Sequence, residues 1–163
     1  MFEITISEQE YLFCITVAAM RNMVARGNNV EDKQVGDQSA IQTDLIGVVG
    51  EYAFCKRNNI FPDLVASPRS GSYDCIFKGY RIDVKATHYK DGRLLATTKK
   101  NNDVDRYVLA IVDGRKIYFP GWIEKDDFIN EKNLKNLGHG FVYALDQDCL
   151  NPWKAEAGED DEY

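Results

Sequence analysis

The chain has 163 residues, of which 44% are hydrophobic and 12% aromatic, enough to bury one substantial core and too few to favour a second domain. No apolar run approaches the length that spans a bilayer, and the start Met1-Phe2-Glu3 lacks the basic segment of a secretory signal, so we expect a cytoplasmic protein. The formal net charge of -6 by itself disfavours a polyanionic partner.

Much of that charge lies in the last nine residues, 155–163, which contain five acidic side chains and no basic one. Without them 20 basic residues face 21 acidic ones, from 26 minus 5, so local basic patches decide whether phosphate binds. We therefore predict one domain over residues 1–154 and a disordered acidic tail over 155–163. A tail that mimics nucleic acid and restrains the site is the less favoured alternative.

The first predicted element is a helix that begins after Ser7 and runs to about Arg26. Ser7 and Glu10 have the spacing of a capping box, and Gly27 ends the helix. Residues 28–40 are polar without an apolar period. They predict a loop, which we interpret as mobile rather than as a cover over a substrate groove.

A second helix is predicted over residues 41–58, with Asp44 and Glu51 two turns apart on one side. Gly47 and Gly50 each cost helix propensity of roughly 1 kcal/mol relative to alanine, a cost that close packing against a sheet would offset. Asp44 is interpreted first as a solvated carboxylate that the helix dipole favours. A second-metal, water-positioning or substrate-binding role is its secondary interpretation.

Residues 72–77 and 80–87 are predicted to form two strands joined by a short Lys-Gly turn. Side chains two positions apart share a face of a strand, so Asp83 and Lys85 point to the same side. The hairpin then brings Asp74 of the first strand beside Asp83.

Three strand-like runs follow, separated by Asn-Asn-Asp and Asp-Gly signals: residues 93–98, 106–112 and 116–123. The middle run is almost entirely apolar, as expected of a strand covered on both faces. Asp126 or Asp127 is predicted to cap a short helix through Asn130, and residues 140–145 fit either a strand or a helix. The element order predicts an α/β fold with a central mixed sheet flanked by helices.

Further polar residues lie beyond two of these strands. Lys99 and Lys100 are candidates for phosphate contacts, although a solvated turn fits equally well. His88 follows the strand of Asp83; we consider a substrate contact or proton relay and prefer a half-exposed strand end. The four cysteines have no Cys-x-x-Cys spacing and are expected to be buried free thiols: Cys14, Cys55, Cys75 and Cys149.

Carboxylates that converge with an amine suit phosphodiester hydrolysis. Mg²⁺ binds through one or two carboxylates and keeps water at its other positions, so Asp74 and Asp83 suit it, and Glu51 would complete the site. A bound ion lowers the pKa of a coordinated water and offsets negative charge in the transition state. Lys85 adds a donor and a compact positive charge.

Three segments resemble the PD-(D/E)XK, or restriction-endonuclease-like, nucleases. Residues 47–56 are similar to the family's Gly-Glu-x-Ala helix, Tyr73-Asp74 to its central Asp, and residues 82–87 to its Asp/Glu-x-Lys strand. The resemblance spans mainly residues 42–123 and departs from the commonest form by an Asp at position 83, which shortens the ligand by one methylene.

The resemblance implies a restriction-endonuclease-like core in which Glu51, Asp74 and Asp83 bind Mg²⁺, with Mn²⁺ as a substitute, and Lys85 is the catalytic lysine. It also implies a nucleic-acid substrate, DNA in the first place, and it allows a homodimer. Two alternatives stay open: a non-catalytic nucleic-acid-binding or protein-binding module on the same fold, and a metal-dependent enzyme acting on a small anionic substrate. A lone Asp-x-Lys on a solvated strand would carry no function.

Overall fold

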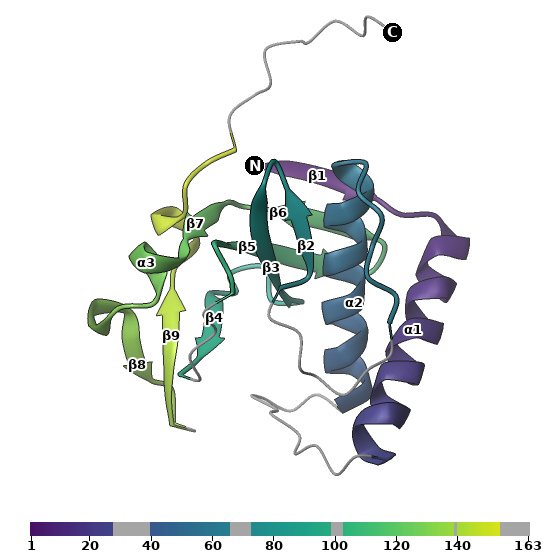
Figure 1. Cartoon of the computed structure of the whole chain (residues 1–163), viewed down its shortest axis with the longest axis horizontal. Coiled ribbons are helices and arrows are strands. Elements are labelled where there is room, and N and C mark those ends of the chain that lie inside the picture. The colour runs from purple at the N-terminus through teal and green to yellow at the C-terminus, as the bar shows by residue number, and fades with distance from the viewer. Residues whose placement is uncertain (28–39, 66–72, 99–102, 139, 154–163) are drawn as a thin grey trace, which may run out of the picture.

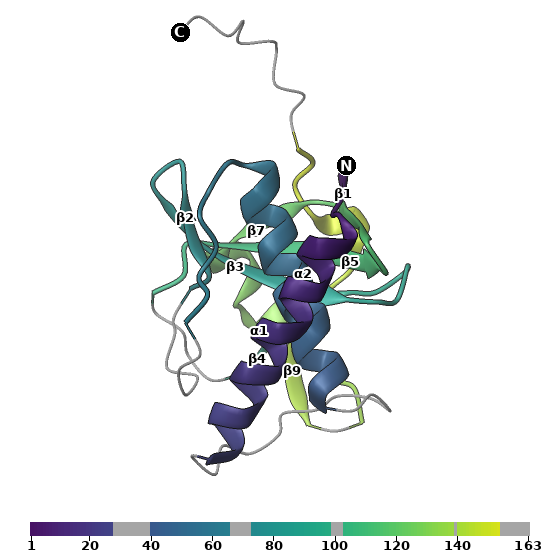
Figure 2. The same cartoon turned by 90° about the vertical axis from the view of Figure 1, so that its right-hand side faces the viewer.

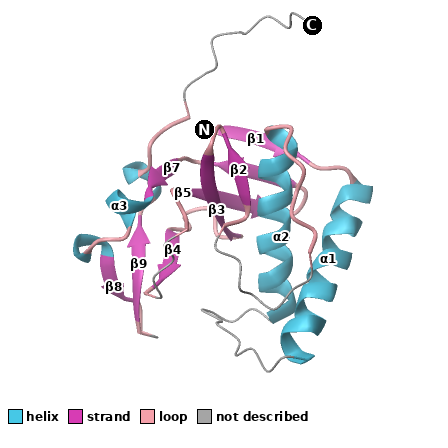
Figure 3. Cartoon of the chain, in the orientation of Figure 1, coloured by secondary structure: helices cyan, strands magenta, loops and turns pink. Residues whose placement is uncertain are grey.

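The computed structural model describes residues 1–27, 40–65, 73–98, 103–138 and 140–153. It shows an α/β protein in which two long helices lie along one face of a curled mixed sheet, while a smaller sheet lies on the other side (Figures 1 and 3). The predicted loop at 28–40 lies outside the described residues except for Ala40, which begins helix α2 (Ala40–Arg57), and the predicted tail at 155–163 lies outside them altogether. No described helix has the length and apolar character that crossing a membrane requires.

The main sheet joins the N-terminal strand to strands from the middle of the chain. In spatial order its strands are β1 (Phe2–Thr5), β6 (Lys116–Phe119), β5 (Arg106–Asp113), β3 (Tyr80–Thr87) and β2 (Cys75–Phe77). Only β3 and β5 run parallel among these neighbours, and β7 (Trp122–Glu124) also pairs with β5. The smaller sheet is antiparallel and consists of β4 (Leu94–Thr97), β9 (Phe141–Leu145) and β8 (Leu134–Asn136).

Helices α1 (Glu8–Gly27) and α2 (Ala40–Arg57) follow the predicted bounds closely. The capping box is confirmed, because the Ser7 backbone N–H donates to Glu10 Oε2 at 2.6 Å and the Glu10 N–H donates to Ser7 Oγ at 3.1 Å. A short helix, α3 (Lys125–Phe128), precedes the 3₁₀ turn η1 (Glu131–Asn133), and a second such turn, η2 (Gln147–Cys149), lies near the end of the described chain.

Helix α2 comes very close to the sheet at Gly50. A Cβ at this position would lie 2.8 Å from the Cβ of Ala86 on β3 and 3.2 Å from the Cβ of Ala110 on β5. Gly47 has no sheet atom within 4 Å. The expectation that packing against the sheet explains both glycines is therefore confirmed for Gly50 and wrong for Gly47.

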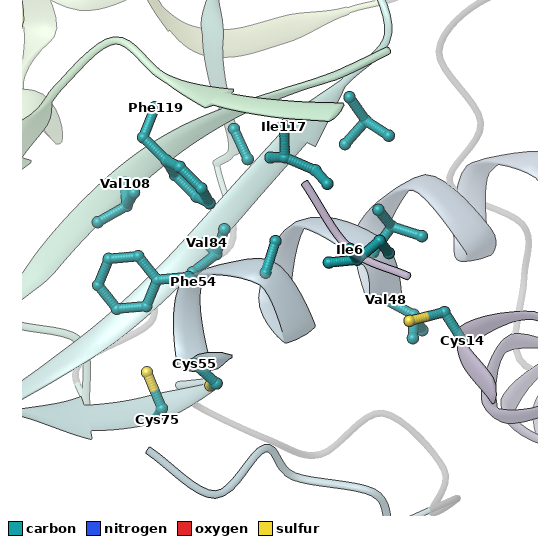
Figure 4. Packing of buried hydrophobic residues seen from close by; sticks show 14 of the residues in the cluster. Ile6, Cys14, Val48, Phe54, Cys55, Cys75, Val84, Val108, Ile117 and Phe119 are labelled. Carbon is teal, nitrogen blue, oxygen red and sulfur yellow. The ribbon is translucent and has the colours of Figure 1, made fainter. Parts of the chain in front are cut away.

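The sheet separates two apolar cores. The core under the helices includes Phe54 of α2, Val84 of β3, Val108 of β5 and Phe119 of β6 (Figure 4). The opposite core joins the other face of β5 to β4, β9 and α3. All residues from 107 to 112 are buried, which confirms that this strand is covered on both faces.

The run 116–123 is not one continuous strand, because it is interrupted at Pro120 and Gly121. Ile111 of β5 pairs with Tyr118 of β6, and Val108 of β5 pairs with Trp122 of β7. The chain thus advances three residues along β5 but four residues along the run that pairs with it, and the extra residue is a β-bulge. Proline has no N–H for a ladder, and a Cβ at Gly121 would lie 2.6 Å from the carbonyl oxygen of Asn151.

Other predictions needed correction at the ends of elements. Strand β2 begins at Cys75 rather than at residue 72, and Glu124 rather than Asp126 or Asp127 occupies the N-cap of the helix that we expected to reach Asn130. The Asn130 side chain instead accepts from Lys132 N and caps η1. Residues 141–145 form a strand. Three cysteines are buried free thiols as expected, whereas Cys149 is exposed.

Candidate active site

The β2–β3 hairpin places Asp74 against β3. Lys78 and Gly79 form its turn with positive φ angles of 51° and 83°, and the strands pair antiparallel. The Asp74 N–H donates to Ile82 O at 2.8 Å, and the Val84 N–H donates to Asp74 Oδ2 at 2.7 Å. The carboxyl group of Asp74 therefore lies alongside the residues that flank Asp83, as the hairpin prediction requires.

Asp83 and Lys85 share one face of β3 and form an ion pair. Lys85 Nζ lies 2.7 Å from Asp83 Oδ1, and Asp83 is one of two buried polar residues within the described part of the chain. The side chain of Lys85 is 38% exposed, so the amine can meet a substrate from solvent. Val84, between them, belongs to the core under α2.

Glu51 follows Gly50, where α2 lies very close to β3 and β5. Its Oε2 accepts a hydrogen bond from Arg21 Nη1 at 2.7 Å, and Arg21 Nη2 donates to the carbonyl oxygen of Asp63 at 2.8 Å. Arg21 comes from α1 and is not among the site residues predicted from the sequence. Its only sequence signal is its position seven residues after Cys14 and four residues after Val17, which are buried on the inner face of that helix. This spacing places Arg21 on the same face.

The pKa values show that the predicted site residues act on one another. Burial, and then the negative charges of Glu51 and Asp83, raise the pKa of Asp74 well above its usual range. Burial raises the pKa of Glu51 more than Arg21 lowers it. Partial burial opposes the charged form of Lys85, but Asp83, Asp74 and Glu51 together raise its pKa. The structure thus brings the four residues into one electrostatic cluster.

A pair of thiols holds α2 against β2 next to this cluster. Cys55, one helical turn beyond Glu51, and Cys75, the neighbour of Asp74, are both buried and hydrogen-bonded to each other, and Figure 4 shows them side by side. The hydrogen bond lowers the pKa of Cys55 and, with burial, raises that of Cys75. This contact helps to fix the helix that carries Glu51 to the strand that follows Asp74.

The donor set suits a hard divalent cation, because it consists of carboxylate oxygens in a partly buried cluster whose negative charges repel one another. Across the described ranges, however, no three or more histidine, cysteine, aspartate or glutamate side chains are grouped so that they could hold a metal ion. Arg21 binds one oxygen of Glu51, and Lys85 binds one oxygen of Asp83. Metal binding would therefore require at least one carboxylate to exchange a cation of the chain for the ion.

The secondary candidates lie elsewhere or are not described. Asp44 accepts from Asn22 Nδ2 at 3.1 Å, and Asn22 is buried, so Asp44 joins α2 to α1 and is more than a solvated carboxylate. His88 is exposed just beyond β3, with its ring 3.9 Å from that of Tyr89, as the preferred interpretation expects. Lys99 and Lys100 lie outside the described residues.

A scan against protein-family models, a search of curated proteins and a search of solved structures each found no match for this chain.

Proposed function

We propose that the protein is a Mg²⁺-dependent nuclease with a restriction-endonuclease-like core, which hydrolyses phosphodiester bonds in nucleic acid, DNA in the first place. The observation that carries the proposal is the cluster of Glu51, Asp74, Asp83 and Lys85, in which the Val84 N–H holds Asp74 beside β3 and Lys85 pairs with Asp83. These residues are separated by up to 34 positions, from 85 minus 51, and come from a helix, a hairpin arm and a central strand. They are also the residues by which the sequence resembles the PD-(D/E)XK nucleases.

Each residue has a task that its surroundings support. Glu51, Asp74 and Asp83 would hold the ion, and the hydrogen bond from the Val84 N–H fixes one oxygen of Asp74. A bound Mg²⁺ supplies a water of lowered pKa and neutralises charge on the phosphate. Lys85, charged and partly exposed beside Asp83, donates to a phosphate oxygen and offsets its developing charge.

A second candidate is a non-catalytic binding module on the same fold. The specific observation in its favour is that Glu51 and Asp83 already have cationic partners within the chain, Arg21 and Lys85. In such a module these ion pairs would be permanent and purely structural. The two candidates predict opposite results for cleavage in the presence of Mg²⁺ or Mn²⁺.

The test uses a mixture of single-stranded DNA, double-stranded DNA and RNA with Mg²⁺ or Mn²⁺. Wild type is expected to cleave at least one substrate, and Lys85→Ala is expected to cleave it at least about 100-fold more slowly, as when a transition-state donor is removed. The matched control is Lys132→Ala, which removes an exposed lysine from η1. Circular dichroism and binding of the uncut substrate verify that Lys85→Ala is folded.

Equal cleavage by wild type and Lys85→Ala would contradict the catalytic assignment. Binding without cleavage under every metal would favour the module. Asp83→Asn gives a second route to the same decision, because it keeps the shape of the buried side chain and removes the carboxylate.

A further inference from the structure

Helix α1 covers α2 and is the outermost element on its side of the protein (Figure 2). Its inner face buries Cys14, Val17, Ala18 and Asn22. Between residues 12 and 23 every exposed position is uncharged: Leu12, Phe13, Ile15, Thr16, Ala19, Met20 and Met23. Leu12 is 55% exposed, Met20 50% and Met23 73%. An apolar face of this extent is unusual on a surface that only meets water.

The exposed residues form a seam rather than scattered contacts. Leu12, Ile15, Ala19 and Met23 follow one another at intervals of three or four, the spacing that keeps side chains in one line along a helix. The small Ala19 and Thr16 lie near its middle, where a second helix could approach closely. Thr16 Oγ1 donates to Leu12 O at 3.1 Å, so its hydroxyl group needs no partner across an interface.

Opposite charges terminate this seam at equal distances from its centre. Glu8 lies four residues before Leu12 and Arg26 three residues after Met23, both exposed and on the same line. The midpoint of Glu8 and Arg26 is residue 17, and that of Leu12 and Met23 lies between residues 17 and 18. A helix laid antiparallel on the seam by a two-fold axis at this point brings Glu8 of each copy to Arg26 of the other. A parallel pair would oppose Glu8 with Glu8.

We propose that this seam is the interface of a two-fold symmetric homodimer in which the α1 helices of two copies pack antiparallel. The seam extends over 19 residues from Glu8 to Arg26, and the 18 steps between them correspond to ~27 Å of helix. A single helix pair of this length lies at the small end of protein interfaces, so the dimer forms at micromolar rather than nanomolar concentrations. Arg21 points to the opposite side of α1, toward Glu51, and the inference does not depend on the proposed function.

A charge exchange tests the geometry directly. Glu8→Arg alone and Arg26→Glu alone each place like charges together at both ends of the seam and are expected to weaken dimerisation roughly tenfold at low salt. An equimolar mixture of these two variants restores both opposite-charge contacts, so heterodimers are expected to exceed either homodimer. The double variant Glu8→Arg/Arg26→Glu is expected to dimerise nearly as well as wild type. Sedimentation velocity over a range of concentrations measures all four samples.

Ala19→Arg tests the apolar middle of the seam, because two guanidinium groups would meet close to the axis. It is expected to weaken dimerisation by more than about tenfold and to leave the helix folded, since arginine is a good helix former. Phe141→Arg is the matched control, because Phe141 on β9 is 61% exposed and lies off α1. Wild type that stays monomeric at every concentration overturns the proposal, as does a dimer that responds to Phe141→Arg but not to Ala19→Arg.

Discussion

The carboxyl group of Asp74 is held in a place that disfavours its charge. The residue is half-buried, and the desolvation of its carboxyl group, with the negative charges of Glu51 and Asp83, places its pKa in the folded protein well above the value in the unfolded chain. The native state consequently binds more protons than the unfolded state once the pH exceeds the usual carboxyl range. The free energy of unfolding must then fall as the pH rises from about 4 toward the raised pKa of Asp74. Above that pKa it stays lowered by the full cost of ionising Asp74 in the folded protein.

Asp74→Asn is expected to remove this penalty. Its side-chain oxygen can still accept from the Val84 N–H, so the variant should unfold at a higher temperature than wild type at pH 8 and show little difference at pH 4. Thermal unfolding at both pH values without divalent ions measures the effect. Asp91→Asn, which removes an exposed carboxyl group beyond β3, is the control. A variant that is less stable than wild type at pH 8 would show that the Asp74 carboxylate is favoured in the fold.

Arg21 competes with any external cation for Glu51. Arg21→Met keeps an unbranched side chain but removes the guanidinium group and frees Glu51 Oε2, so Mn²⁺ is expected to bind more tightly while the metal-free protein loses about 1–3 kcal/mol of stability. Titration calorimetry and urea unfolding provide the two measurements. Lys56→Met is the matched control, because Lys56 pairs with Glu10 at 2.7 Å and also joins α2 to α1, but outside the cluster. Weaker Mn²⁺ binding in Arg21→Met would mean that Arg21 positions Glu51 for the ion.

At the scale of elements, the separation between α2 and the sheet determines where Glu51 lies. Gly50→Ala improves helix propensity by up to about 1 kcal/mol, but its Cβ would press against Ala86 and Ala110, whose own Cβ atoms cannot move away without the strands. We expect a net loss of about 1–3 kcal/mol. Gly47→Ala makes the same change one turn earlier, without a sheet atom nearby, and should be neutral or stabilising. Urea unfolding of both variants compares them, and equal effects would disprove the close approach.

The sequence predicts elements well where local signals agree. The capping box and the Lys-Gly turn define the start of α1 and the β2–β3 hairpin, and alternation gives the bounds of β3. Strands β1 and β8 are not predicted, because four and three residues carry too little alternation and depend on partners distant in the chain. The bulge at Gly121 likewise arises from the approach of Asn151, which no local pattern records.

The candidate site shows the same division. Glu51, Asp74, Asp83 and Lys85 are predictable because their segments have a recognisable order and strand periodicity. Arg21 is not, because its partner Glu51 is 30 residues away and the pairing exists only after α1 packs on α2. The exposed side of α1 is also not predictable from the sequence, because amphipathic spacing alone does not reveal which face of a helix remains uncovered.

For the whole molecule, a cation that binds the cluster must stabilise the native state, because the unfolded chain separates the ligands. Mn²⁺ at 100 times its dissociation constant should raise the free energy of unfolding by about 2.7 kcal/mol, or the melting temperature by roughly 5–11 °C for a chain of this size. At one fixed Mn²⁺ concentration, the gain in melting temperature should be larger at pH 8 than at pH 5. Asp74 and Glu51 must lose protons to bind the ion, and their pKa values are raised. Calorimetric scans with Mn²⁺, then with excess EDTA, measure the gain and its reversal. Asp83→Asn should abolish most of it, and a wild-type melting temperature that ignores Mn²⁺ at both pH values would rule out a metal centre in this cluster.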